Sequence, residues 1–279
     1  MTMVSTESIK AKLTTVAKER GIEPQNLLNK LGEERFLARL AVSPWADRII
    51  FKGGSLLPHL VETSRRTRDI DFSVRNIDNK LENLLNVVHE IASIDLDDAF
   101  VFRKPRGERL EHTRLPYPGA RIKINFSLGK VRGSIWMDLA LGDDVKPVKQ
   151  VLRVVRYRNK PLVGEDIHLL AYPPEFLFAE KFQTAVLLGA ANSRMKDFYD
   201  LIKLIDSGSL NRPKLNDALA RTFNRRKTPR KNRLEFSVED MERLQGSWAT
   251  FVRKWGLDDI ADDFSLVISR LNDFLTAIS

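Results

Sequence analysis

The sequence predicts an α+β protein in which a mixed α/β N-terminal unit is followed by an all-helical C-terminal unit. Residues 69–74, 119–129 and 131–143 alternate polar and apolar side chains, which is typical of strands with one buried face. Strand patterns end at about residue 165, and apolar residues then recur at three- and four-residue spacing. We therefore expect two domains, covering residues 1–165 and 166–279.

The first elements of the chain are predicted to be two helices, a strand and a third helix. Residues 5–20 and 24–40 have helical spacing, with Ser5 or Thr6 as a cap and Gly21 as a stop. The run RIIFKGG, at 48–54, is a strand pattern that ends in paired glycines. SLLPHLVE follows directly and is predicted to be a helix that begins at Ser55.

The next predicted elements are a strand, a helix and a hairpin. In RDIDFSV, Asp69 and Asp71 project from one face of a strand, while Ile70 and Phe72 enter the core. Residues 76–93 form an amphipathic pattern, and the alternating runs 119–129 and 131–143 are separated by a glycine-lysine turn. We expect these two runs to pair as an antiparallel hairpin.

The last third of the chain is predicted to be helical throughout. One helix begins at the prolines of PPEFLFAEKFQTAVLLG and stops at its glycine, and the next, SRMKDFYDLIKLIDSG, has Ser193 as its expected cap. Two or three further helices follow. The run NRRKTPRKNR, at 224–233, is the strongest internal loop pattern.

Composition narrows the class of protein. The chain has 279 residues and 43% hydrophobic content, without an apolar run long enough for a membrane span and without a signal-peptide pattern, so we expect a cytoplasmic protein with no membrane partner. With no cysteine and four scattered histidines, disulfides, thiol catalysis and thiolate zinc sites are excluded. A metal would bind carboxylates, which favours Mg²⁺, with Mn²⁺ as an alternative.

The positive charge is concentrated in a few stretches. The net charge is +9, residues 221–233 contain no acidic side chain, and residues 103–123 are also basic. A polyanion such as RNA is a natural partner for the cluster at 221–233, because each neutralised phosphate releases counterions. The candidate residues are Arg225, Arg226, Lys227, Arg230, Lys231 and Arg233. The alternatives are a solvated, disordered surface loop or a docking surface for an acidic protein.

Glycines and aspartates close together in the sequence suggest phosphate and metal chemistry. Gly53 and Gly54 allow backbone amides to approach an anion, and a helix that begins at Ser55 would point its free N–H groups at the same place. Asp69 and Asp71 can hold a divalent ion, and Asp138 on the alternating run 131–143 is the expected third carboxylate.

Two metal ions between such carboxylates stabilise the attacking and leaving oxygens of a phosphoryl displacement, and Asp138 can help to deprotonate the attacking hydroxyl. The arrangement suits nucleotidyl transfer from a nucleoside triphosphate. Each part alone has a structural explanation, as a tight turn or as an exposed strand end. Their combination is more specific, and the GxGxxG and Walker patterns are absent.

Four stretches resemble the AbiEii family of nucleotidyltransferase toxins, which belong to the DNA polymerase beta superfamily. They are KGGSLL, RRTRDIDF, IWMDLALGD and AEKFQTAVLLGAANSRMKDFYDLI, and the resemblance runs from about Arg35 to Ile205. It implies a polymerase-beta-like nucleotidyltransferase core with a mixed sheet, followed by a helical domain. Residues 210–279 carry no motif of the family.

The resemblance also implies roles for individual residues. Gly54 and Ser55 would contact the triphosphate, Asp69 and Asp71 would bind Mg²⁺, and Lys181 would contact triphosphate oxygens. Asp197 matches the last site residue of the family, and Arg66 is a further candidate for phosphate binding. Lys181 among apolar helix neighbours would need an anionic partner, although an ion pair with an adjacent side chain would also satisfy it.

By the same resemblance, the protein is a toxin of an abortive-infection or toxin–antitoxin system, neutralised by a separate antitoxin protein. In the related MenT toxins the reaction adds nucleotides to the 3′ end of tRNA and blocks translation. Two alternatives remain. One is a nucleotidyltransferase with a small-molecule acceptor such as an aminoglycoside, which the basic stretch argues against. The other is an inactive nucleic-acid-binding protein, which the intact set of site residues argues against.

Overall fold

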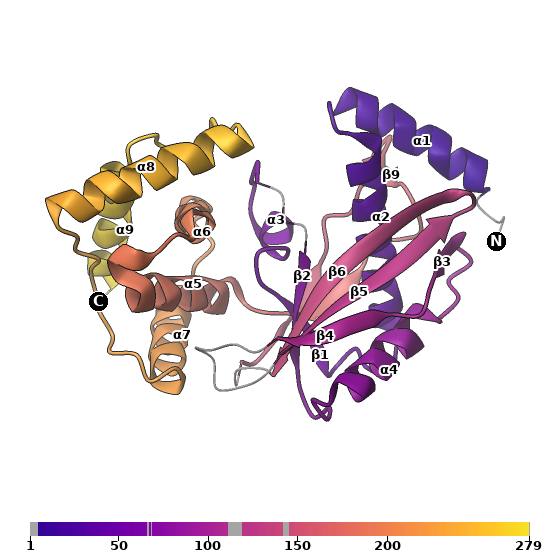
Figure 1. Cartoon of the computed structure of the whole chain (residues 1–279), viewed down its shortest axis with the longest axis horizontal. Helices are drawn as coiled ribbons and strands as arrows, with labels where there is room; N and C mark the ends of the chain where they lie inside the picture. The colour runs from indigo at the N-terminus through magenta and orange to yellow at the C-terminus, as the bar shows by residue number, and fades with distance from the viewer. Residues whose placement is uncertain (1–4, 66, 68, 111–118, 142–144, 279) are drawn as a thin grey trace. The chain divides into compact units, whose positions relative to one another are not determined.

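The computed structural model describes residues 5–65, 67, 69–110, 119–141 and 145–278. The chain divides into two compact units (Figure 1). The first consists of Met1–His59 and Thr67–Ala171, and the second of Leu60–Arg66 and Tyr172–Ser279. The short segment 60–66 therefore belongs with the C-terminal helices, although it lies in the first third of the sequence.

The first unit is built on one large mixed sheet. Its strand order is β3-β5-β6-β2-β1-β10-β7, and β4 also pairs with β5. The pairs β2–β6 and β1–β10 are parallel, and the other pairs are antiparallel. The strands are β1 (Ile49–Lys52), β2 (Asp69–Val74), β3 (Phe100–Phe102), β4 (Arg106–Leu110), β5 (Gly119–Leu128), β6 (Val131–Leu141), β7 (Val148–Val151) and β10 (His168–Ala171). A separate hairpin is formed by β8 (Arg156–Tyr157) and β9 (Lys160–Pro161).

Helices α2 (Pro24–Val42) and α4 (Leu81–Ala92) pack on the sheet of this unit, and α1 (Thr6–Glu19) packs on α2. Helix α2 lies against β6 and β10, and α4 lies against β4 and β5. Phe36 of α2 meets Phe72 of β2, with their ring centroids 6.4 Å apart. Because side chains alternate along a strand, Asp69 and Asp71 project from the opposite face of the sheet.

The predicted hairpin is confirmed. Strands β5 and β6 pair antiparallel around a turn at Gly129 and Lys130, with Leu128 opposite Val131. Gly129 has φ +59°, a left-handed conformation that glycine adopts without steric cost. The same register places Arg121 opposite Asp138.

Two predictions for this region are wrong. The helix after the glycine turn, α3 (Leu57–Leu60), has only four residues and begins after Ser55, so it offers no helix N-terminus at that serine. The chain turns instead toward contacts of the second unit, where the Thr63 hydroxyl and the Ser64 backbone N–H bond to the Tyr199 hydroxyl. A strand also exists beyond residue 165, because β10 pairs with β1.

The second unit is helical, as predicted. It contains α5 (Pro174–Leu188), a short 3₁₀ turn, α6 (Met195–Asp206), α7 (Arg212–Arg225), α8 (Val238–Trp255) and α9 (Phe264–Ile278). Trp248, Phe264 and Phe198 form part of its core, with ring centroids 5.0 to 5.5 Å apart. The expected serine cap of α6 is wrong, since Arg194 is the N-cap residue and has no side-chain capping bond. Within the described ranges, no helix is both long and apolar enough to cross a membrane.

Candidate active site

A hydrogen bond joins the glycine turn after β1 to strand β2. The Ser55 hydroxyl accepts a hydrogen bond from the Asp71 backbone N–H at 3.3 Å and lies 3.5 Å from the Lys52 carbonyl oxygen. Gly53 has φ +74°, and a Cβ at this position would lie 2.1 Å from Asp71 Oδ2. Only glycine therefore lets the turn approach the Asp71 carboxylate so closely.

The three predicted metal-binding aspartates lie on one face of two adjacent parallel strands. In the β2–β6 register, Asp71 is the neighbour of Asp138, and Asp69 is the neighbour of Trp136. Asp69 and Asp138 are therefore diagonal neighbours on the same face. The strand pairing thus brings carboxylates from two distant parts of the sequence together.

Arg121 of β5 is a member of this constellation that the sequence interpretation missed. Its Nε lies 2.8 Å from Asp138 Oδ1, and its Nη2 lies 2.7 Å from Asp138 Oδ2. The same Nη2 is 3.6 Å from Asp69 Oδ2. These hydrogen bonds to Asp138 raise the pKa of Arg121 above its usual value, so the guanidinium stays charged.

The carboxylates of Asp69, Asp71 and Asp138 are suitable ligands for a divalent cation, although Asp138 is already paired with Arg121. Carboxylate oxygens are the ligands that Mg²⁺ and Mn²⁺ prefer, and Asp69, Asp71 and Asp138 share one face of β2 and β6. Among the described residues, however, no group of three or more acidic or histidine side chains is arranged to hold a metal. Both oxygens of Asp138 accept hydrogen bonds from Arg121, so a metal ion would compete with the guanidinium for them.

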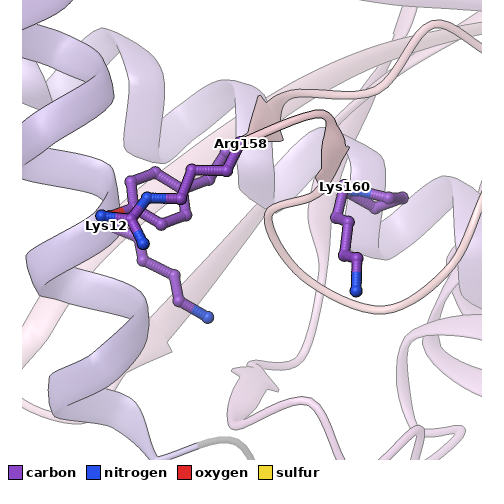
Figure 2. Close-up of a pocket in the computed structure, with 5 residues that line it drawn as sticks. Lys12, Arg158 and Lys160 are labelled. Atoms are coloured by element: carbon purple, nitrogen blue, oxygen red, sulfur yellow. The ribbon is translucent and has the colours of Figure 1, made fainter.

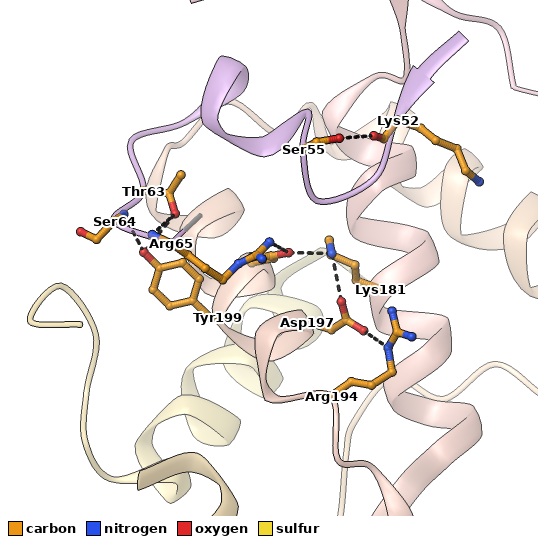
Figure 3. A network of polar contacts seen from close by, with 10 residues as sticks. Lys52, Ser55, Thr63, Ser64, Arg65, Lys181, Arg194, Asp197 and Tyr199 are labelled. Carbon is orange, nitrogen blue, oxygen red and sulfur yellow. Dashed lines mark hydrogen bonds and ion pairs between the residues drawn. The ribbon is translucent and has the colours of Figure 1, made fainter. Parts of the chain in front are cut away.

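The second unit contains a buried ion network centred on Lys181 (Figure 3). Lys181 Nζ of α5 lies 3.0 Å from Asp197 Oδ1 and 2.7 Å from Asp200 Oδ2, both on α6. Arg65 donates to both oxygens of Asp200, each at 2.9 Å. Arg194 donates to Asp197 at 2.6 Å. Lys181 thus has anionic partners within its own unit.

The charges of this network stabilise one another in their ionised forms. Burial raises the pKa of Asp197, but the charges of Lys181 and Arg194 outweigh it and lower the pKa to about 2. Burial lowers the pKa of Lys181, but Asp200 and Asp197 outweigh it and raise that pKa above its usual value. Three cations, Lys181, Arg65 and Arg194, face two carboxylates, which leaves the network with one net positive charge.

The remaining candidate residues have different surroundings. Arg66 lies outside the described residues. Arg226 pairs with Glu180 at 3.1 Å and donates to the Gln183 side chain at 2.8 Å, so it is part of the packing of the second unit. Arg230 donates to the Asn216 side chain at 3.1 Å. The side chains of Lys227, Arg230, Lys231 and Arg233 are exposed.

Arg65 is a second residue that the sequence interpretation did not assign to the network. It is one of several arginines in the run RRTRDIDF, and nothing in the sequence distinguishes it from its neighbours. Its bidentate bond to Asp200 holds the segment 60–66 against α6.

Comparison with known proteins identifies the family. A family model described as nucleotidyl transferase AbiEii toxin of a type IV toxin–antitoxin system matches residues 35–270. The chain belongs to the AbiEii family. As an AbiEii-family protein it is a nucleotidyltransferase, and its toxin class implies a nucleotide substrate and an antitoxin partner. No match was found among curated proteins.

Two solved structures share the fold of this AbiEii-family chain. A protein of H. pylori classed as a nucleotidyltransferase has a TM-score of 0.52 at 15% identity, and the match covers 92% of this chain and 96% of the other. MenT4, a nucleotidyltransferase toxin of Mycobacterium tuberculosis H37Rv, also has a TM-score of 0.52, at 16% identity, covering 96% of this chain and 98% of the other. These matches support the predicted nucleotidyltransferase fold across both units.

Proposed function

We propose that this AbiEii-family toxin transfers a nucleotide from a nucleoside triphosphate to an RNA acceptor, with a divalent metal held by Asp69, Asp71 and Asp138. The observation that carries the proposal is the β2–β6 register, which sets Asp71 beside Asp138 and Asp69 diagonal to it. The glycine turn lies directly against Asp71. Carboxylates next to a turn of this kind suit a metal-bound triphosphate.

The chain's own residues have distinct parts in the reaction. Gly53 and Gly54 would let backbone amides approach the phosphates, and Ser55 holds the turn to β2 through the Asp71 backbone N–H. Asp138, once released from Arg121, is placed to accept the proton of the attacking hydroxyl. Mg²⁺, or Mn²⁺ in its place, would neutralise the charge that develops on the transferred phosphoryl group.

Lys181, oriented by Asp197, is proposed to contact triphosphate oxygens, as the family resemblance implies. The net positive charge of the Lys181 network favours a polyphosphate anion. The pKa of the neighbouring Lys196 is lowered by burial and by the charge of Arg194, which is consistent with positive potential around this network. Asp197 would keep Lys181 charged and oriented rather than contact the nucleotide.

The acceptor is proposed to be the 3′ end of tRNA, whose modification would block translation in the cytoplasm. The resemblance to MenT toxins supports this choice, and so does the net charge of +9. An antitoxin encoded nearby would neutralise the activity, in keeping with the toxin class of the family. Such a system would serve in abortive infection as a phage defence.

The test is a transfer assay with total RNA, tRNA and a panel of small acceptors that includes aminoglycosides, each with one labelled triphosphate at a time and Mg²⁺. We expect label in acid-precipitable RNA and none in small products. Label only in a small acceptor would replace the RNA proposal by the alternative of a small-molecule nucleotidyltransferase. Absence of label in every reaction would contradict both.

A further inference from the structure

A basic pocket lies between two elements of the first unit that are far apart in sequence (Figure 2). Helix α1 contributes Lys12, and the β8–β9 hairpin contributes Tyr157, Arg158, Lys160 and Pro161. The pocket has a volume of about 340 Å³. Three of its five lining residues are cationic and none is acidic, so the lining favours an anion.

The cations of this pocket have no carboxylate partner of their own. Among the described residues, none of Lys12, Arg158 and Lys160 forms an ion pair. Asp166, five residues after Pro161, is paired with Arg156 at 2.6 Å and does not line the pocket. Like charges held near one another without a counter-ion favour the binding of an external anion.

The turn that presents Arg158 is strained. Arg158 has φ +49° and Asn159 has φ +63°, so both central residues of the two-residue turn are left-handed. Such turns favour Asn-Gly or Asp-Gly, because a side chain other than that of Asn, Asp or Gly is disfavoured there. Glycine would relieve the strain at Arg158, so a non-glycine residue there is a candidate for a functional side chain.

The guanidinium of Arg158 is also held in place. Its Cζ lies 5.2 Å from the centroid of the Tyr157 ring, within the range of a cation–π contact. This contact limits the motion of the side chain, so less entropy is lost when it binds a ligand. Arginine presents its donors in a planar fork that matches two phosphate oxygens.

We propose that this pocket binds the phosphodiester backbone of the RNA acceptor. The inference rests on the proposed function and locates part of its acceptor-binding surface, on elements outside the glycine turn and the carboxylates. Cations next to an aromatic ring are typical of single-stranded nucleic-acid sites, where phosphates meet the cations and bases meet the ring. The tyrosine is what favours RNA over an acidic protein surface.

The first test compares two matched triple variants. In the pocket variant, Lys12, Arg158 and Lys160 are each changed to Gln. In the control, Lys130, Arg132 and Lys149, which are exposed in the same unit, are changed to Gln, which removes the same charge. Affinity for labelled tRNA is measured by fluorescence polarisation from about 0.05 to 0.3 M salt. Removal of three phosphate-binding cations should weaken binding about 100-fold near 0.1 M salt, and lower the salt slope by about 0.7 for each cation.

The second test uses the strain at Arg158. Arg158→Gly suits the left-handed turn better and removes the guanidinium, so we expect an unchanged or higher Tm together with weaker tRNA binding. A lower Tm with unchanged tRNA affinity would show that Arg158 serves only to stabilise the hairpin, and would overturn the inference.

The remaining outcomes separate the inference from the proposed function. If the wild type binds tRNA and the pocket variant binds it equally well, the pocket is not part of the acceptor site, while the proposed function stands. If the pocket variant keeps its tRNA affinity but loses affinity for the purified antitoxin, the surface docks an acidic protein and the inference is overturned. If the wild type does not bind tRNA at all, the choice of tRNA as acceptor and the role of the pocket both fail, while transfer to another RNA is still tested by the assay with total RNA.

Discussion

At the residue scale, the ion pair between Arg121 and Asp138 determines the state of the proposed metal site. Without a metal, Arg121 neutralises two of the three carboxylates, since it bonds to Asp138 and lies 3.6 Å from Asp69. A divalent cation placed there would compete with the guanidinium for the same oxygens. Arg121 therefore stabilises the metal-free protein and opposes metal binding by Asp138.

Arg121→Gln should bind Mn²⁺ more tightly, by about 3- to 10-fold, because the competing cation is gone. The metal-free variant should also lose about 1–2 °C in Tm, since the guanidinium no longer offsets repulsion between Asp138 and Asp69. Calorimetric titration with Mn²⁺ and thermal melting without metal measure these two effects.

Lys123→Gln provides the control for this prediction. Lys123 lies two residues along β5, on the same face, and its Nζ is 5.0 Å from the centroid of the Trp136 ring rather than bonded to a carboxylate. Lys123→Gln and Arg121→Gln each remove one positive charge. Weaker Mn²⁺ binding by Arg121→Gln, or equal gains in both variants, would show that the ion pair does not compete with the metal.

The lowered pKa of Asp197 predicts that the folded protein loses stability in acid. Its pKa is lowered from 3.8 to about 2 in the folded protein, so its ionised form contributes stability above about pH 4 that is lost as the pH falls through about 2. For this buried side chain the contribution is about 2 kcal/mol. The free energy of unfolding of the wild type, compared with Asp197→Asn, should show a difference that shrinks from about pH 5 to about pH 2. A difference independent of pH would refute the assigned pKa.

At the element scale, the hairpin of β5 and β6 shows how far the sequence can be interpreted. The glycine-lysine turn is recognisable, and a two-residue turn fixes the register, so counting back from Leu128 and Val131 places Arg121 opposite Asp138. The sequence therefore contains the signal for this ion pair. The ion pair is missed when Arg121 is considered only as one charge of the basic stretch 103–123, because strand register is then ignored.

Strand β10 and the end of helix α3 could not be predicted from local sequence patterns. β10 is four residues long and pairs with β1, more than 100 positions earlier, so no local pattern links them. The sequence predicts that α3 continues through residue 62, but the hydrogen bonds of Thr63 and Ser64 to Tyr199 draw the chain away. In both cases, contacts distant in sequence outweigh local propensity.

The turn between β1 and α3 gives a prediction of its own. Gly53→Ala should lower the free energy of unfolding by about 1–3 kcal/mol, because φ +74° disfavours alanine and the new methyl group would meet the Asp71 carboxylate. The rate of nucleotide transfer should also fall, because the new methyl group would displace the Asp71 carboxylate. Denaturant unfolding and the transfer assay measure the two effects.

Gly246→Ala is the matched control for that substitution. Gly246 lies within α8, and no atom lies within 4 Å of the position that an alanine Cβ would take, so alanine should stabilise the helix by about 0.5–1 kcal/mol. If Gly53→Ala were as stable as the wild type, the close approach of the turn to Asp71 would not be a constraint on the fold.

At the scale of the whole molecule, the candidate site residues are divided between two units. The carboxylates and the glycine turn belong to the first unit, and Lys181 and Asp197 belong to the second. The sequence indicates both sets through short motifs. It does not indicate that segment 60–66 joins the second unit, because that assignment depends on Arg65 and Asp200, which are 135 positions apart.

The basic loop after α7, at residues 227–233, is a candidate RNA-binding surface. Lys227, Lys231 and Arg233 are exposed, whereas Arg226 is committed to Glu180 and Gln183. Changing the first three to Gln should weaken tRNA binding and lower its salt slope by about 0.7 to 0.9 for each phosphate that is no longer neutralised, with little effect on triphosphate affinity. An unchanged slope would remove this loop from the RNA site and direct attention to residues 103–123.

The central claim is that the carboxylates of β2 and β6 catalyse metal-dependent nucleotidyl transfer to RNA. Its most direct test is the rate of label transfer from each triphosphate to tRNA by the wild type and by Asp71→Asn, with Mg²⁺ and at equal Tm. Asparagine keeps the shape of Asp71 and removes the charge that binds the metal. We predict label in tRNA with the wild type and a loss of at least about 100-fold in Asp71→Asn. Full transfer by a folded Asp71→Asn protein would contradict the account.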